Sequence, residues 1–274
     1  MKRNKIFLLA FLILSLINSA SYSQTSNSNE WELIATVNVP NIHVISTDPY
    51  NNIYIGDKSG NIIKTDATGK IIHNFSPSRK GEIALLEAWR SVNIFAFYRE
   101  LQTYTILDRF LNTSSPATKF NRDLIGFARL ASFSSDNNLW IIDDIEFSLK
   151  KLNLSFQQLD VNTRLDLLLD PQQYDLNFMR EYQNLLFIND KNSGILIFDN
   201  LGNYKTTLPH KGLDFFCFDK NNIYFLTDNT IKSIDVYTYK ETSIPLPDGN
   251  FKKAIIGKNE IYLFSDHYFS IYKK

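Results

Sequence analysis

The sequence predicts an all-β fold, and three observations carry this prediction. Tyr, Phe, Ile and Thr gather in short runs separated by Asn, Asp, Gly and Pro, whereas stretches with helical periodicity are few. A polar residue followed by an apolar, often aromatic pair recurs at 52–54, 93–95, 138–140, 184–186, 222–224 and 260–262. Successive copies are 41, 45, 46, 38 and 38 residues apart, which is the spacing of propeller blades. The recurrence predicts a six-bladed β-propeller in one domain, residues 30–274.

The first residues have the pattern of a secretory leader. Met1–Lys5 is basic, Ile6–Leu16 is almost continuously apolar, and small residues follow as far as Ser23. We predict a signal peptide at residues 1–23 and a flexible linker at 24–29. The apolar run is short for a bilayer span, so a retained anchor is the less favoured alternative. The prediction is export to the periplasm, with no membrane insertion after cleavage.

The charge balance and the cysteine content narrow the possible partners. The chain has 29 basic and 29 acidic side chains, and the leader contains three of the basic ones and none of the acidic ones. A nearly neutral mature chain argues against nucleic acid or an anionic membrane as the partner. Cys217 is the sole cysteine and lies in an apolar run, so we expect a buried thiol and a fold held by its core without disulfides.

Two units match each other most closely, and the match identifies the turns. Asp57 and Asp66 are nine residues apart, and Gly69 follows three residues later. The fourth unit repeats this layout with Asp190, Asp199 and Gly202. An aspartate that closes a strand accepts hydrogen bonds from its own turn, and glycine adopts the positive φ that tight turns require. The pattern predicts hairpin turns at both places.

Each of the first five units offers four strands, in chain order. The first unit has 43–48, 53–56, 62–65 and 71–75, and the second has 85–88, 94–98, 104–107 and 118–120. The third has 128–133, 139–142, 149–152 and 158–161, and the fourth has 176–180, 185–188, 195–198 and 204–208. The fifth has 215–218, 223–226, 231–234 and 242–246.

The sixth unit is short by one strand. Its predicted strands are 253–256, 261–264 and 269–272, and one unpaired strand, 31–37, remains at the other end of the propeller sequence. We predict that 31–37 pairs with 269–272, because such a closure removes an exposed sheet edge. The segments 112–124 and 165–174 fit the repeat poorly, and 165–170 is open to either a short helix or a further strand.

Acidic residues follow the second predicted strand in five of the six units. They are Asp57, Asp143 with Asp144, Asp190, Asp228 and Asp266. Because these loops share one face of a propeller, one hypothesis is a ring that holds a divalent cation or a cationic ligand. The favoured interpretation is that aspartate suits a turn after a strand, since ligands differ between blades whereas fold signatures repeat. We therefore expect no cofactor, with a divalent cation as the alternative.

Over residues 30–274 the chain resembles six-bladed propellers of the NHL-repeat and gluconolactonase kind. The resemblance rests on the aromatic second strand, the aspartate after it and the Asp-x-x-Gly turn. Gluconolactonase-type enzymes hold a metal through Glu, Asn and Asp in the channel, and Glu82, Glu87 and Asp175 do not match such a set. A metal-dependent hydrolase or lactonase at the channel mouth is thus the alternative function, and we predict no catalytic residue.

Catalytic motifs of other kinds have no support in the sequence. The four histidines lack metal-ligand spacing, and G-x-S-x-G does not occur. Aromatic and arginine residues alternate in the second unit, and interfaces favour both types. The candidate protein-binding residues are Trp89, Arg90, Tyr98, Arg99 and Arg109, against the simpler interpretation of core plus solvated rim.

In size, leader and propeller pattern, the chain is similar to the periplasmic plug subunits of bacterial type IX secretion translocons. Those subunits close the periplasmic mouth of a large outer-membrane barrel. The resemblance implies an exported, non-enzymatic propeller that binds another envelope protein, with an outer-membrane secretion barrel as the specific partner. The final residues, 271–274, are used in the last predicted blade, so we expect no separate sorting domain there.

Overall fold

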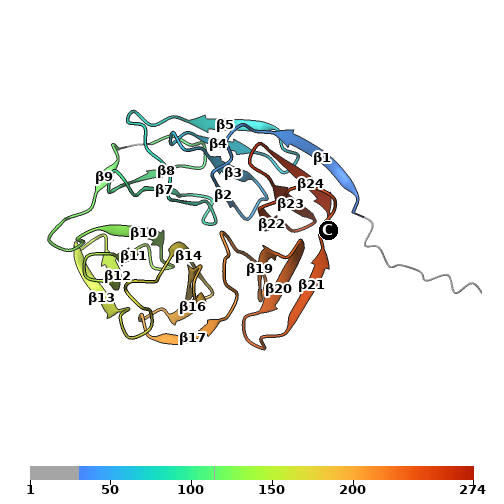
Figure 1. The fold of residues 1–274 in the computed structure, drawn as a ribbon. Coiled ribbons are helices and arrows are strands. Elements are labelled where there is room, and N and C mark those ends of the chain that lie inside the picture. Colours follow the sequence, from blue (N-terminus) through green and yellow to red (C-terminus); the bar gives the residue numbers. More distant parts are fainter. Residues whose placement is uncertain (1–30, 114) are drawn as a thin grey trace, which may run out of the picture. The chain divides into compact units, whose positions relative to one another are not determined.

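The computed structural model describes residues 31–113 and 115–274, and in them twenty-four strands form six four-stranded antiparallel sheets. The sheets are arranged in a ring, with β2, β6, β10, β14, β18 and β22 innermost (Figure 1). Neighbouring inner strands pack against each other around the ring, as β10 does against β6 and β14. The predicted all-β fold and the six blades are confirmed. The predicted leader 1–23 and linker 24–29 lie outside the described residues.

The strand bounds follow the predicted repeat closely. The first blade contains β2 (Val44–Thr47), β3 (Ile53–Gly56), β4 (Ile62–Thr65) and β5 (Ile71–Phe75). The second contains β6 (Leu85–Glu87), β7 (Ile94–Tyr98), β8 (Thr103–Leu107) and β9 (Thr118–Lys119). The third contains β10 (Ala128–Phe133), β11 (Leu139–Asp143), β12 (Ser148–Asn153) and β13 (Gln158–Arg164).

The remaining blades have the same form. The fourth contains β14 (Leu176–Tyr182), β15 (Leu185–Asp190), β16 (Gly194–Asp199) and β17 (Tyr204–Leu208). The fifth contains β18 (Cys217–Asp219), β19 (Asn222–Thr227), β20 (Thr230–Asp235) and β21 (Glu241–Pro245). The sixth contains β22 (Lys253–Ile256), β23 (Glu260–Phe264), β24 (Tyr268–Lys273) and β1 (Leu33–Asn38).

Two local predictions differ from the structure. The segment 165–170 is neither a helix nor a strand, because Leu165 starts a turn in which its carbonyl accepts the amides of Leu168 and Leu169. The inner strand of the fifth blade begins at Cys217 and not at Phe215. Phe215 and Phe216 are buried outside the ladder, so their apolar character reflects burial and not pairing.

The first and last parts of the propeller share one sheet, as predicted. In the sixth blade β1 pairs antiparallel with β24, with Thr36 opposite Ser270 and Val37 opposite Phe269. The indole Nε1 of Trp31 donates to the carbonyl of Pro245 at 3.0 Å, and its ring lies 5.2 Å from that of Tyr272. The pairing covers the edge of β24 and closes the ring (Figure 1).

The predicted hairpin turns are confirmed. A carboxylate oxygen of Asp66 accepts the amides of Thr68 and Lys70, and Asp199 holds the equivalent turn of the fourth blade in the same way. Gly69 and Gly202 have φ values of +88° and +80°. Glycine is favoured there because a left-handed backbone costs more for other residues, although Asn51 and Leu111 adopt it in the equivalent turns.

A glycine pair provides a test of the turn geometry. We expect Gly194→Ala to destabilise the fold by on the order of 3 kcal/mol, because φ is +116° and the added Cβ would collide with the backbone carbonyl of Leu208. Gly212→Ala is the matched control, since φ is +73° but no atom lies within 4 Å of the added Cβ. The control should lose only about 1 kcal/mol in urea unfolding. Equal losses would contradict this account.

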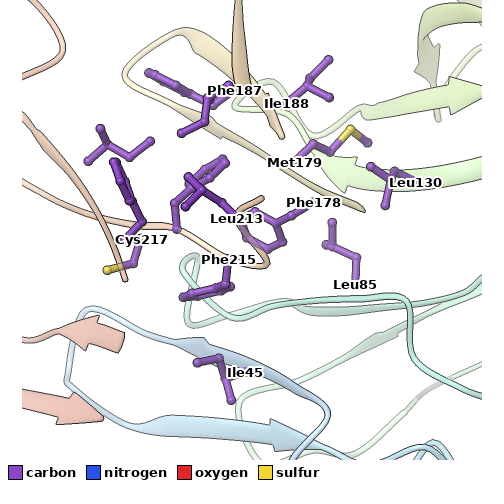
Figure 2. Packing of buried hydrophobic residues seen from close by; sticks show 14 of the residues in the cluster. Ile45, Leu85, Leu130, Phe178, Met179, Phe187, Ile188, Leu213, Phe215 and Cys217 are labelled. Atoms are coloured by element: carbon purple, nitrogen blue, oxygen red, sulfur yellow. The ribbon is translucent and has the colours of Figure 1, made fainter. Parts of the chain in front are cut away.

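The core fills the space between and inside the blades. Trp140, Tyr54, Phe95 and Tyr262 occupy the repeated aromatic position of the second strands and are 0% exposed. Figure 2 shows side chains of the inner strands gathered around the centre of the ring, among them Ile45, Leu85 and Leu130. The sheets are thus held to one another by apolar packing, and the centre is closed by side chains.

Within residues 31–113 and 115–274 we find no helix long and apolar enough to cross a membrane.

Candidate functional site

The alternation of strands gives the ring two faces. One face carries the turns that join the first strand to the second and the third strand to the fourth in each blade, and we call it the cavity face. The opposite face carries the turns from second to third strands and the connections between blades. The two faces have a cavity each at the channel mouth, of about 700 Å³ on the cavity face and about 410 Å³ on the opposite face.

Between the two mouths, a buried group of polar side chains crosses the channel. The Arg180 guanidinium on β14 lies 3.8 Å from the Glu87 carboxylate on β6, and their side chains are 6% and 1% exposed. Arg180 also donates to the hydroxyl of Ser46 on β2 at 3.3 Å. Glu87 accepts the backbone amide of Phe133 and the hydroxyl of Ser132, both at 2.8 Å. Inner strands of four blades are joined by this group.

Burial dominates the electrostatics of the channel. It raises the pKa of Glu87 and lowers that of Arg180, and each charge partly offsets the shift of the other. Burial also raises the pKa of the nearby Cys217 thiol to about 12, so at neutral pH it is a neutral thiol and not a nucleophilic thiolate. The Cys217 thiol beside the channel is therefore not an activated nucleophile.

The cavity on the cavity face begins directly at Arg180. Its walls include the stacked rings of Tyr182 and Phe218, whose centroids are 4.3 Å apart. Its charged lining residues are Arg180, Lys220, Lys258 and Lys274 against Asp48, Glu181 and Asp219. Its volume lies within the usual range of ligand pockets, about 300–1,000 Å³. The combination of apolar walls with a few polar groups is typical of a binding site.

The mouth on the opposite face is more strongly charged, with five cationic and three acidic side chains in its lining. Lys252 pairs with Asp266 at 2.5 Å, His43 with Glu82 at 2.9 Å, and Lys191 pairs with Asp214. Lys253 lines the same mouth and donates to the carbonyl of His43. Lys58, Arg99 and Lys253 also line this mouth and form no side-chain ion pair among the described residues, so this mouth keeps positive charge as well.

The aspartates of the hypothetical metal ring lie on the opposite face, but each is used locally. Asp57 accepts the amides of Ser59 and Asn61, and Asp143 accepts three backbone amides and the Lys150 ammonium. The others contact their own neighbours: Asp144 binds Arg129 and Tyr174, Asp190 binds Asp175 and Ser193, Asp228 binds Thr227, and Asp266 binds Lys252. In the described part of the chain, no three metal-ligating side chains converge.

The five candidate protein-binding residues of the second blade do not form one surface. Trp89 and Arg90 lie on the cavity face, with the guanidinium 5.0 Å from the indole ring. Tyr98 is 2% exposed, and Arg99 lies at the opposite mouth. Arg109 stacks on Phe110 in the turn after β8. The reason is that β7 crosses the whole blade between Arg90 and Tyr98, so sequence neighbours end on opposite faces.

Sequence reasoning missed the channel group. Glu87 was considered only as a metal ligand, and Arg180 was not singled out. A signal was present, because Met179-Arg180-Glu181 places two charges inside an inner strand whose other residues are mostly apolar. A charge in a fully buried strand must be paired or must serve a ligand.

The exposed apolar side chains are distributed unevenly between the two faces. Seven of those in turns lie on the cavity face: Tyr50, Val92, Phe110, Phe156, Leu201, Tyr237 and Tyr239. Two lie on the opposite face, Ile145 and Leu167. Turn aspartates hold several of the first set in place, as Asp48, Asp108 and Asp235 do by accepting the amides of Tyr50, Phe110 and Tyr237.

The fold and the closed channel define the class of this protein as a six-bladed β-propeller. The sequence matches no protein-family model and no curated protein. Among solved structures, the extracellular domain of a one-component system from B. thetaiotaomicron aligns with a TM-score of 0.57 at 15% identity, over 85% of this chain and 33% of that one. This chain therefore spans about a third of that relative.

Two other solved structures are matched over nearly their whole length. Virginiamycin B lyase from Staphylococcus aureus aligns with a TM-score of 0.62 at 10% identity, over 89% of this chain and 100% of that one. YCF48 bound to D1 peptide aligns with a TM-score of 0.55 at 11% identity, over 90% and 98%. At such low identities the likeness shows the propeller fold alone, because one fold hosts many functions.

Proposed function

We propose that this chain is an exported, non-enzymatic propeller that binds another protein of the cell envelope through its cavity face. The observation that carries the proposal is the concentration of exposed apolar turn residues on that face. Exposed apolar side chains gathered on one face are typical of protein-binding surfaces, and tyrosine is enriched at interface centres. The sequence pattern of a leader supports export.

The backbone of the fifth blade adds support. Tyr239 has a φ of +58°, a left-handed conformation that is unfavourable for a bulky residue, and its side chain is 51% exposed. Tyr237 stands beside it and is 57% exposed, with its hydroxyl donating to Gln183 at 2.7 Å. Backbone strain that displays an aromatic ring to solvent is consistent with a binding role. YCF48, a propeller of similar fold, has been solved with a bound peptide.

Substitutions on the two faces test the proposal. We expect Tyr50→Ser, Phe156→Ser and Tyr237→Ser together to weaken partner binding at least about tenfold, because exposed aromatic anchors carry interface energy. Melting should change by no more than a few degrees, about 2 °C per residue, since each side chain is exposed. The matched control is Ile145→Ser with Leu167→Ser on the opposite face, which should leave binding unchanged.

A photo-crosslinking residue placed at position 237 would capture the partner, and the same residue at position 167 serves as the control. We expect an adduct with one envelope protein from position 237 only. Equal adducts from both positions, or a partner in another compartment, would overturn the proposal. The proposal also needs no cofactor, so a stoichiometric divalent ion in the purified protein would favour the hydrolase alternative.

A narrower form of the proposal concerns the identity of the partner. The similarity in size, leader and propeller pattern to plug subunits suggests an outer-membrane secretion barrel. Stoichiometric co-purification of such a barrel from outer membranes would support this form. A different crosslinked partner would remove it while leaving protein binding intact.

A further inference from the structure

Two buried donors in the cavity of the cavity face have no acceptor. In the described residues, Nε1 of Trp89 and Nε of Arg180 are both buried and make no hydrogen bond, although the Arg180 Nε lies 3.8 Å from a carboxylate oxygen of Glu87. They come from different blades and line the same cavity. Most buried polar atoms in proteins are hydrogen-bonded, and an unpaired donor is unfavourable. The unpaired Trp89 indole, in a cavity that also contains an Arg180 guanidinium only loosely paired with Glu87, indicates that an acceptor from outside the chain completes the site.

The charges at the cavity indicate an anionic acceptor. Each acid of the lining is already engaged: Asp219 pairs with Lys274 at 2.5 Å, Asp48 accepts from its own turn, and Glu181 accepts the Trp140 indole at 2.5 Å. Lys220 and Lys258 form no ion pair with any side chain in the part of the chain that the structure describes. The rim therefore keeps unpaired positive charge.

The walls indicate which kind of anion fits. The ring pair of Tyr182 and Phe218 and the apolar surfaces of Pro49 and Ile256 line the cavity beside these donors. A free phosphate would leave such walls uncovered, whereas a carboxylate carried on a peptide would cover them. The planar Arg guanidinium also matches a carboxylate.

We propose that this cavity receives a carboxylate of a partner protein, from an acidic side chain or a chain terminus, flanked by an apolar residue. This inference rests on the proposed function and names the chemistry that the partner must present. Arg180 and Trp89 bind the carboxylate oxygens, and Lys220 and Lys258 attract the segment to the mouth. The exposed tyrosines of the cavity face contact the surface from which the segment projects.

The three tryptophans provide an internal test with a small probe. Trp31 donates to Pro245 and Trp140 to Glu181, whereas Trp89 has no acceptor. We would titrate the ¹⁵N-labelled protein with N-acetylphenylalanine, which carries a carboxylate beside an apolar ring. The Trp89 indole resonance should shift downfield while the other two remain, with a dissociation constant on the order of 1 mM. The control is N-acetylphenylalaninamide, which lacks the charge and should shift none.

Variants measured by calorimetry extend the test. Trp89→Phe deletes a donor that makes no hydrogen bond within the chain. It should leave the melting temperature unchanged and weaken binding of N-acetylphenylalanine roughly fivefold. Arg180→Gln should weaken binding of the probe about tenfold or more. If this single variant fails to fold because Glu87 is left as an unpaired buried charge, the double variant Arg180→Gln with Glu87→Gln takes its place. Lys220→Gln with Lys258→Gln should weaken it about threefold, and less at high salt.

The failures of the two proposals are distinguishable. Equal shifts from the amide, a Trp89 shift from inorganic phosphate and not from N-acetylphenylalanine, or no shift at 20 mM of the probe would each overturn the carboxylate site. Crosslinking from Tyr237 would still report protein binding in those cases. If the site is correct, N-acetylphenylalanine at saturation should reduce that crosslink and the amide should not. A probe that binds without reducing it would overturn the partner as the source of the carboxylate.

Discussion

A chain that begins at Val39, and so lacks β1, is expected to lose on the order of 4 kcal/mol of folding free energy. The reason is that the β1–β24 ladder disappears, at about 1 kcal/mol per backbone hydrogen bond. For a domain of this size the melting temperature should fall by about 10 °C. The exposed edge of β24 should also promote association between copies, measurable by light scattering.

The control for this truncation is a chain that begins at Trp31, which retains β1 and its pairing with β24. It should melt like the full-length protein. A second variant acts in the other direction: Thr36→Cys with Ser270→Cys places two thiols where the hydroxyl oxygens are 3.1 Å apart. Oxidation should raise the melting temperature, since the bond closes almost the entire chain. A truncated chain that melts at the wild-type temperature would show that the closure contributes no stability.

Lys150→Met is expected to lose about 3–5 kcal/mol at neutral pH. The Lys150 and Asp143 side chains are both 0% exposed, and their Nζ and Oδ2 atoms lie 2.7 Å apart. Removing the ammonium leaves a buried carboxylate without its counter-charge. Lys151→Met is the matched control on the same strand, because Lys151 pairs with an Asp136 that is 48% exposed. The control should lose less than about 1 kcal/mol in denaturant unfolding.

The stability difference between wild type and Lys150→Met should depend on pH in a definite direction. Burial alone would raise the pKa of Asp143, but the hydrogen bonds from Lys150 and three backbone amides outweigh burial and lower it. A carboxyl whose pKa is lowered on folding adds stability above its unfolded pKa, and that stability is lost as the pH falls through the folded pKa. The gap between wild type and Lys150→Met should therefore narrow below about pH 4. A gap that widens in acid would contradict the assignment.

The repeated Asn-apolar-aromatic phrase predicted the fold because it reports a local requirement. Each unit by itself shows a turn residue followed by a strand that is buried on both faces. The spacing of the copies identifies them as propeller blades, and the number of copies gives the number of blades. The closure by 31–37 was also predictable, because an odd strand at each end of the repeat has one natural partner. The structure of the segment 165–170 was harder to predict, since its apolar residues fit a helix, a strand or a turn equally well.

The site depended on relationships that no local pattern records. Arg180 and Glu87 are ninety-three positions apart in the sequence and face each other only because their strands are both innermost in the ring. Trp89 and Tyr98 are close in sequence, yet Trp89 lines a cavity and Tyr98 is buried at the far end of β7. The blades, their turns and their order could therefore be predicted from the residues along the chain. Which side chains meet in the channel, and which face displays the exposed rings, could be read only from the folded molecule, because both follow from radial assembly of distant strands.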